Sequence, residues 1–214
     1  MSLAEAMKAC PAIAILRSSS AARYGEVSDV VVAAGFRAVE FTFSAPDVTD
    51  ELRAYAARKQ DDVALGAGTV TTVEQARRAV DAGATYLISP AVCVEVIEEG
   101  ARLGVPVLPG ALTPTEILQA WRAGATMVKV FPASAMGGPA YLKAVRGPLP
   151  EIPLVPTGGI DADNAGAYLA AGAVGVGVGS PLVADACEPG GDLDALAERA
   201  RALVAAVNTA GGTP

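Results

Sequence analysis

The sequence predicts an α/β fold in which eight strand–helix units close into a single (β/α)8 TIM barrel. Two observations support this prediction. A helical stretch that ends in Ala-Gly or Leu-Gly is followed at once by a short apolar strand, and this pattern recurs along the chain. Successive copies lie about 20 residues apart or a little over twice that, and one strand plus one helix fills the shorter interval.

The helices are marked by their ends. The predicted C-terminal ends are Ala34-Gly35, Ala82-Gly83, Leu103-Gly104, Ala123-Gly124 and Ala171-Gly172. Glycine just past a helix adopts the left-handed conformation at little steric cost. The expected N-caps are Thr72, Thr113 and Asp161, and Glu116 completes a capping box with Thr113.

Eight short apolar segments are the predicted strands. They are residues 12–16, 38–43, 63–67, 86–89, 105–108, 127–131, 153–157 and 174–178. Strands that are apolar on both faces are typical of buried parallel sheets, so a doubly wound open sheet is the alternative to a barrel. No linker divides the chain, and we expect residues 1–214 to form one domain with a flexible tail over about 208–214.

The composition limits which binding partners and which cellular compartment we expect for this protein. The net charge is −7 and no Lys/Arg cluster occurs, which argues against nucleic acid and anionic membranes. No apolar run approaches the roughly 18 residues of a membrane-spanning helix. The start of the chain lacks the pattern of a secretory signal, and three widely spaced cysteines, Cys10, Cys93 and Cys187, suit a reducing cytoplasm.

The chain contains no histidine. This excludes catalytic triads or dyads that use histidine, and it excludes histidine-ligated zinc. A magnesium ion held by carboxylates is not excluded. Proton transfer must rely on carboxylates, lysine, tyrosine, cysteine or water.

Lys129 is the first candidate for chemistry. Of four lysines it alone lies in the middle of an apolar strand, residues 127–131. Burial of an ammonium lowers its pKa, and a neutral amine is a nucleophile toward ketones. The alternative is a structural ion pair inside the barrel.

Glu40 is the second candidate. In the strand 38–43, Val39, Phe41 and Phe43 share one face, while Glu40 and Thr42 share the other. If the apolar face meets the helices, Glu40 points into the barrel. There it could pair with Lys129, move protons, or do both.

The strand ends carry the candidates for binding. Strands seven and eight end in glycine-rich segments, 156–161 and 175–180, at the place where TIM barrels bind phosphate. The alternative for these glycines is tight turns in a narrow barrel. The candidate binding residues at the barrel mouth are Arg17, Thr69, Pro90, Thr157, Gly158, Gly159, Gly179 and Ser180. Thr69 could instead be a helix cap, and Arg17 could instead form a salt bridge at the rim.

Taken in order, these segments resemble the 2-keto-3-deoxy-6-phosphogluconate (KDPG) and 4-hydroxy-2-oxoglutarate (KHG) aldolase family. The matching motifs are residues 12–17, 39–42, 66–70, 88–90, 107–110, 128–132, 156–160 and 179–183. They cover nearly the whole chain and are specific in combination, although none is specific alone.

The resemblance implies a role for each matching residue. Lys129 matches the Schiff-base lysine, and Glu40 matches the glutamate that acts as general acid and base. Thr69 matches the threonine that holds the pyruvyl carboxylate, with Pro90 in the same pocket. Gly158, Gly159 and Ser180 match the phosphate contacts. The family is trimeric and uses no metal or organic cofactor, so a homotrimer acting on a small phosphorylated keto acid is expected.

One position departs from the family pattern. Many members have an arginine four residues after the glutamate, in contact with the substrate carboxylate, where this chain has Ser44. Related 6-phosphogalactonate aldolases also lack that arginine, and Arg17 could supply the missing charge. The sugar acid is therefore open between gluconate and galactonate types. A phosphate-binding isomerase or epimerase and a non-catalytic metabolite-binding barrel are the rival functions.

Overall fold

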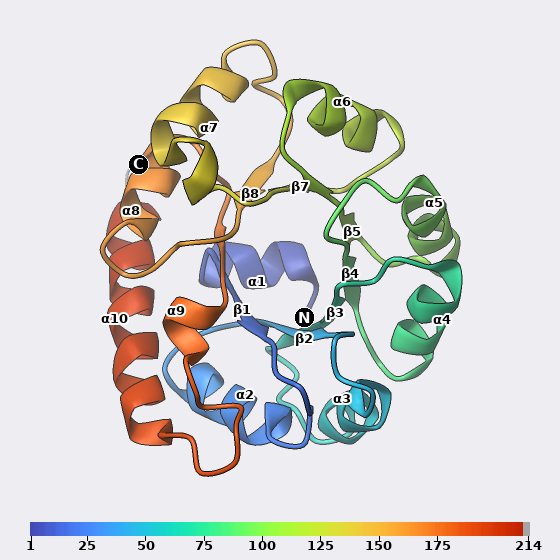
Figure 1. Cartoon of the computed structure of the whole chain (residues 1–214), viewed down its shortest axis with the longest axis vertical. Coiled ribbons are helices and arrows are strands. Elements are labelled where there is room, and N and C mark those ends of the chain that lie inside the picture. The colour runs from blue at the N-terminus through green and yellow to red at the C-terminus, as the bar shows by residue number, and fades with distance from the viewer. Residues whose placement is uncertain (212–214) are drawn as a thin grey trace.

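The computed structural model describes residues 1–211 and forms the predicted barrel, a ring of parallel strands with helices outside it (Figure 1). The strands are β1 Ala12–Leu16, β2 Ala38–Thr42, β3 Ala64–Gly68, β4 Tyr86–Ile88, β5 Val107–Leu108, β6 Gly110–Ala111, β7 Val128–Val130, β8 Leu154–Pro156 and β9 Val176–Val178. The helices are α1 Leu3–Ala9, α2 Tyr24–Ala33, α3 Val48–Ala56, α4 Val73–Asp81, α5 Val94–Leu103, α6 Pro114–Arg122, α7 Gly138–Arg146, α8 Ala165–Ala170, α9 Ser180–Val183 and α10 Leu193–Gly211, with the 3₁₀ turn η1 at Ser134–Met136.

The strand pairing closes the ring. One run of neighbours is β5-β4-β3-β2-β1-β9, and the other is β6-β7-β8. Every pairing is parallel, and a bridge between Thr157 and Gly177 joins β8 to β9. β5 lies within the fifth predicted strand, 105–108, and β6 continues it two residues beyond the predicted end, after Pro109, which has no N–H to give to a ladder. The closed ring confirms the barrel over the open sheet.

The predicted N-caps and C-terminal ends of the helices are confirmed with one exception. All five glycines at the predicted helix ends have a positive φ, from 74° at Gly104 to 119° at Gly35. Thr72 caps α4, and Thr113 and Glu116 form the expected capping box on α6. Asp161 is not an N-cap, because α8 begins only at Ala165. Its Oδ1 accepts hydrogen bonds from the backbone N–H groups of Asp163 and Asn164 and closes a turn ahead of that helix.

An additional N-terminal helix closes the bottom of the barrel. The helix α1 crosses the centre of the ring in Figure 1 and buries Leu3, Ala6 and Met7 against residues inside the barrel, Tyr86 and Leu108 among them. Ser2 and Glu5 form a capping box at its start. Within residues 1–211, this helix fills the lower end of the barrel interior, and the cavity described below lies at the C-terminal ends of the strands.

The C-terminal segment is more regular than expected. The helix α10 continues to Gly211, through the first four residues of the expected flexible tail, and residues 212–214 lie outside the described part. Its buried residues Leu196, Ala200, Leu203 and Val207 belong to the core between the helices and the barrel.

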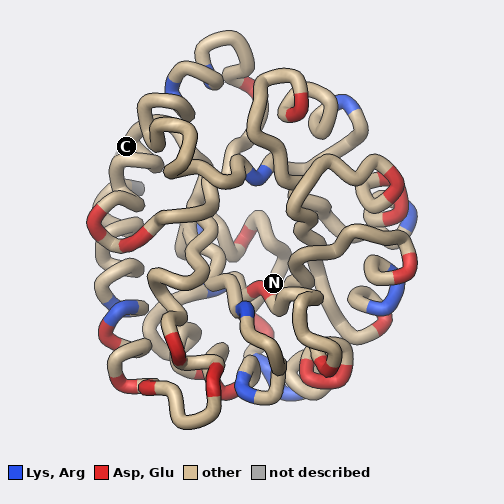
Figure 2. The backbone as a smooth tube through the Cα atoms, viewed as in Figure 1, with Lys and Arg blue, Asp and Glu red and all other residues tan. Residues whose placement is uncertain are grey.

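Charged side chains lie mainly on the outer helices and loops, with acidic and basic residues interspersed (Figure 2). Within residues 1–211, none of the helices combines the length and the apolar character needed to cross a membrane. Charged residues inside the ring are rare, and two of them, Glu40 and Lys129, are buried.

Candidate active site

A cavity of about 600 Å³ opens at the C-terminal ends of the strands. Its lining residues are Ile15, Arg17, Thr69, Pro90, Lys129, Phe131, Thr157, Gly158, Gly159, Gly179, Ser180 and Pro181. Nine of the ten residues that the sequence singles out are in this set. The tenth, Glu40, is not part of the lining because its side chain is fully buried beneath the cavity.

Lys129 lies at the centre of β7 with only 6% of its surface exposed. Burial lowers the pKa of its ammonium group, and the nearby positive charge of Arg17 lowers it further. The carboxyl group of Glu40 acts in the opposite direction. The Lys129 Nζ lies 5.0 Å from the centre of the Phe131 ring. The site thus offers an amine that is biased toward its neutral, nucleophilic form.

Glu40 is completely buried on β2, and neither of its carboxylate oxygens has a hydrogen-bond partner in the described residues. Burial raises the pKa of this carboxyl group, while the charges of Lys129 and Arg17 lower it in part. No salt bridge joins Glu40 to Lys129 within residues 1–211. Burial without a hydrogen-bond partner thus favours the protonated form of this acid over the form it would have in water.

Two glycines of β3 make room for the side chains inside the barrel. A Cβ atom at Gly68 would overlap the carboxyl group of Glu40, and one at Gly66 would overlap the ring of Tyr86. The Tyr86 hydroxyl donates to the carbonyl oxygen of Val39 at 2.7 Å. Tyr86 therefore forms an apolar floor next to Glu40 with its own polar atom satisfied, which helps to keep water away from the acid.

At the mouth, Thr69 and Arg17 are joined by a hydrogen bond. The Arg17 Nη2 donates to the Thr69 Oγ1 at 2.9 Å. Thr69 has a φ of 60°, a left-handed conformation that is uncommon for a residue other than glycine and that concentrates at functional sites. Arg17 and Lys129 are the two cations that line the cavity.

Ser44, at the position where the resemblance leads one to expect an arginine, is not part of the cavity lining. Its hydroxyl pairs with the Thr42 Oγ1 at 2.8 Å, and the Thr42 hydroxyl reaches the carbonyl oxygen of Leu16 at 2.9 Å. Arg17 is therefore the one arginine in the cavity lining given above.

The opposite side of the mouth is made of backbone. Gly158 and Gly159 have φ values of 99° and 70°, so side chains other than glycine would be strained there. Among the described residues, no protein group accepts a hydrogen bond from the N–H groups of Gly158, Gly159, Gly179 or Ser180. Free N–H groups beside a cavity form an anion-binding surface.

Sequence reasoning did not select Ile15, Phe131 and Pro181. Phe131 had a readable signal, because it follows Lys129 by two residues, and such residues point to the same side of a strand. Ile15 and Pro181 carry no chemical signal of their own, and only the folded barrel places them at the cavity.

Comparison with known proteins agrees with this arrangement. A model of the KDPG and KHG aldolase family matches residues 3–198. The chain belongs to this aldolase family. It is therefore a lyase of the aldolase type with a small keto acid as its class of substrate.

Three relatives illustrate the range within the family. The chain is 35% identical to a 2-dehydro-3-deoxy-phosphogluconate aldolase of Pseudoalteromonas atlantica over 84% of this chain and 83% of the relative. It is 34% identical to a 2-dehydro-3-deoxy-6-phosphogalactonate aldolase of Escherichia coli over 94% and 96%. A KDPG aldolase of Legionella pneumophila, whose structure holds pyruvate as a covalent carbinolamine intermediate, is 29% identical with a TM-score of 0.84, over 95% and 98%.

Proposed function

We propose that this chain is a class I aldolase that cleaves KDPG to pyruvate and glyceraldehyde 3-phosphate through a Schiff base on Lys129. The observation that carries the proposal is a nearly buried amine that opens onto the cavity, with an unpartnered acid buried below it. The covalent carbinolamine in the Legionella pneumophila relative supports the same chemistry.

The first steps form the covalent adduct. The neutral Lys129 Nζ attacks the C2 ketone of the substrate to give a carbinolamine, and loss of water gives an iminium ion. The iminium withdraws electrons, so it can accept the pair released when the C3–C4 bond breaks. The low exposure of Lys129 favours the neutral amine that the first step requires.

The next steps need a group that moves protons. Glu40, directly or through a water molecule, removes the proton of the C4 hydroxyl as the C3–C4 bond breaks, and glyceraldehyde 3-phosphate leaves. The bond's electrons remain as an enamine, which is protonated at C3 and hydrolysed to pyruvate and free Lys129. The raised pKa of Glu40 suits a group that must both accept and return a proton.

Each side of the cavity mouth is proposed to bind one end of the substrate. Thr69 and Arg17 are the proposed partners of the carboxylate, since a hydroxyl and a guanidinium suit that group. The free N–H groups of the two glycine segments, together with Ser180, are the proposed phosphate site. Pro90 and Thr157 line the same cavity and are further proposed substrate contacts.

A second substrate is favoured by one observation. Ser44 replaces the arginine found in many family members, and Arg17 is the cation left at the mouth beside Lys129. The 6-phosphogalactonate analogue, which differs in stereochemistry at C4, is therefore the second candidate. KHG, which would give pyruvate and glyoxylate, is a further one because it has the same keto-acid end.

Borohydride reduction in the presence of pyruvate tests the covalent step. A stable pyruvyl adduct on Lys129, located by mass spectrometry of peptides, is the expected result. The matched control is Lys143→Ala, because Lys143 is exposed on α7. That variant should still be labelled, and Lys129→Ala should not. An unlabelled wild-type protein would favour an isomerase or a binding protein instead.

The expected homotrimer stays a proposal. Phe131, which lines the cavity, and Met136, in η1, are large apolar side chains with 39% and 45% of their surface exposed, and contact between copies would cover them. Light scattering after size exclusion would give the mass of the assembly, and a monomer at micromolar concentration would contradict the proposal.

A further inference from the structure

The proposed phosphate side of the cavity depends on a very short helix. The helix α9 contains only Ser180–Val183, and the residues at its start, Gly179 to Pro181, line the cavity. It ends at Ala184, whose φ of 47° is unusual for alanine. A helix of one turn has little stability of its own, so its position must be fixed by contacts from outside.

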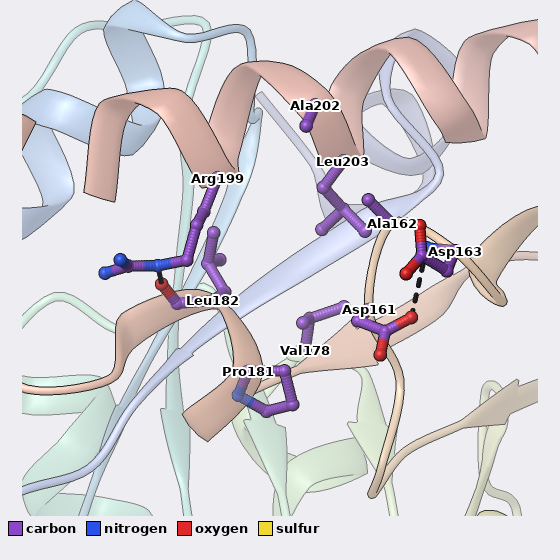
Figure 3. Close-up of a pocket in the computed structure, with 9 residues that line it drawn as sticks. All are labelled: Asp161, Ala162, Asp163, Val178, Pro181, Leu182, Arg199, Ala202 and Leu203. Atoms are coloured by element: carbon purple, nitrogen blue, oxygen red, sulfur yellow. Dashed lines mark hydrogen bonds between the residues drawn. The ribbon is translucent and has the colours of Figure 1, made fainter. Parts of the chain in front are cut away.

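Arg199 of α10 supplies such a contact. Its Nε donates to the carbonyl oxygen of Leu182 at 2.7 Å, and its Nη2 donates to that of Val183 at 3.4 Å. Figure 3 shows the Arg199 side chain reaching from α10 to the end of α9. Carbonyl groups in the last turn of a helix lack partners within it, and a guanidinium is a strong donor to them.

Packing is incomplete on the same side of α9. A second cavity of about 180 Å³ lies between α9, α10 and the turn at residues 161–163, with Pro181, Leu182 and Leu203 in its wall (Figure 3). Pro181 lines both cavities. Because this pocket is open to solvent and leaves that side of α9 unpacked, α9 can shift if its hydrogen bonds to Arg199 are lost.

We propose that Arg199 is a positioning residue that sets the phosphate affinity of the site by holding α9 from behind. The inference rests on the proposed function, because it assumes that Gly179 and Ser180 bind phosphate. Arg199 itself does not line the reaction cavity, so its effect must pass through α9. Lys129 lies in β7 and Thr69 directly follows β3, so their chemistry should not depend on Arg199.

The test compares substrates with and without a phosphate group. In Arg199→Met, which keeps the length but removes the donors, we expect the KM for KDPG to rise about tenfold. The kcat for KDPG and both constants for KHG should stay within about twofold. Arg201→Met, at an exposed position of the same helix, is the matched control and should change neither substrate. Arg199→Lys, which retains a donor, should lie between wild type and Arg199→Met.

A binding measurement keeps the result independent of turnover. The Kd of inorganic phosphate, measured by calorimetry, should rise about tenfold in Arg199→Met and stay unchanged in Arg201→Met. Equal losses on KDPG and KHG, or an unchanged phosphate Kd, would overturn the inference even if the enzyme is an aldolase. A wild-type protein that binds phosphate but releases no pyruvate from any substrate would refute the proposed function. The role of Arg199 would then be decided by the phosphate Kd of the variants alone. If Arg199→Met does not fold, Arg199→Lys decides by the same two measurements.

Discussion

Glu40 and Glu99 are the two buried glutamates within residues 1–211, and their surroundings are opposite. Glu99, on α5, accepts hydrogen bonds from Arg77 at 2.7 Å and from Arg102 at 2.6 Å and 2.9 Å. These two arginines lower the pKa of Glu99 to about 2. Glu40 has no hydrogen-bond partner, and burial raises its pKa.

The difference separates an acid held in ion pairs from one that we propose to take part in the reaction. The ion pairs of Glu99 satisfy its charge and join α4 to α5. Glu40 is left unsatisfied in the interior, where an unpartnered polar group destabilises the fold. Ionisable groups that are buried without a partner are concentrated at functional sites, where a lower free energy of unfolding is the cost of the chemistry.

The largest expected effect is at the amine beside Glu40. Lys129→Ala should lower kcat/KM for the cleaved keto acid by about 10⁴-fold or more, because no other cavity residue offers an amine. Pyruvate release measured with a coupled dehydrogenase assay checks this. Activity within tenfold of wild type would mean that the reaction does not pass through this residue.

Glu40→Gln should slow the reaction by about 10²- to 10⁴-fold, because the amide keeps the shape and loses the transferable proton. Borohydride trapping of pyruvate on Lys129 should persist, and exchange of the pyruvate methyl protons with solvent, followed by NMR, should slow with cleavage. If exchange kept its wild-type rate, another group would be moving the proton at C3.

The same variant should sharpen the contrast in stability. A carboxyl group with a raised pKa in the folded state ionises first in the unfolded state, so its presence weakens the fold as pH rises above about 4.5. The Tm of Glu40→Gln should therefore equal or exceed that of wild type at pH 7, with the advantage shrinking as pH falls toward 4. A variant clearly less stable than wild type at pH 7 would mean that the acid has a partner after all.

The smallest effect is expected at Glu99, with the opposite sign. Its folded pKa of about 2 lies below the usual 4.5, so its contribution is present above about pH 4.5 and is lost as pH falls toward 2. Glu99→Gln should lower the Tm by a few degrees at most at pH 7, because its arginine partners are exposed. Activity should not change. Glu98→Gln, at an exposed neighbouring position, is the control and should leave the Tm unaffected.

Much of the barrel can be predicted from the sequence because local preferences of the residues agree with the final fold. Glycines such as Gly83 and Gly124 end helices by their backbone freedom alone, which needs no knowledge of the neighbours. Lys129 and Glu40 stand out because charged residues are rare in apolar strands. Asp161 shows the limit of this approach, since an aspartate favours a turn and a helix cap by the same hydrogen bond.

Other features depend on contacts between distant parts of the chain. The capping box of Ser2 and Glu5 could have predicted α1, but nothing local places that helix under the barrel. Arg199 looks like an ordinary helix arginine in the sequence, and its importance arises only where α10 passes the end of α9. Lining residues such as Ile15 are likewise set by the closure of the ring.

The N-terminal helix covers the end of the barrel opposite the cavity mouth. Leu3, Ala6 and Met7 fill that end, so we expect reactants and products to enter and leave through the mouth. Trimming this helix would admit water beneath Tyr86 and toward Glu40, which would hydrate the acid and return its pKa toward that of a free side chain. If Glu40 moves protons as we propose, its pKa depends on the helix that covers the far end of the barrel, and deletions at the start of the chain should change the reaction.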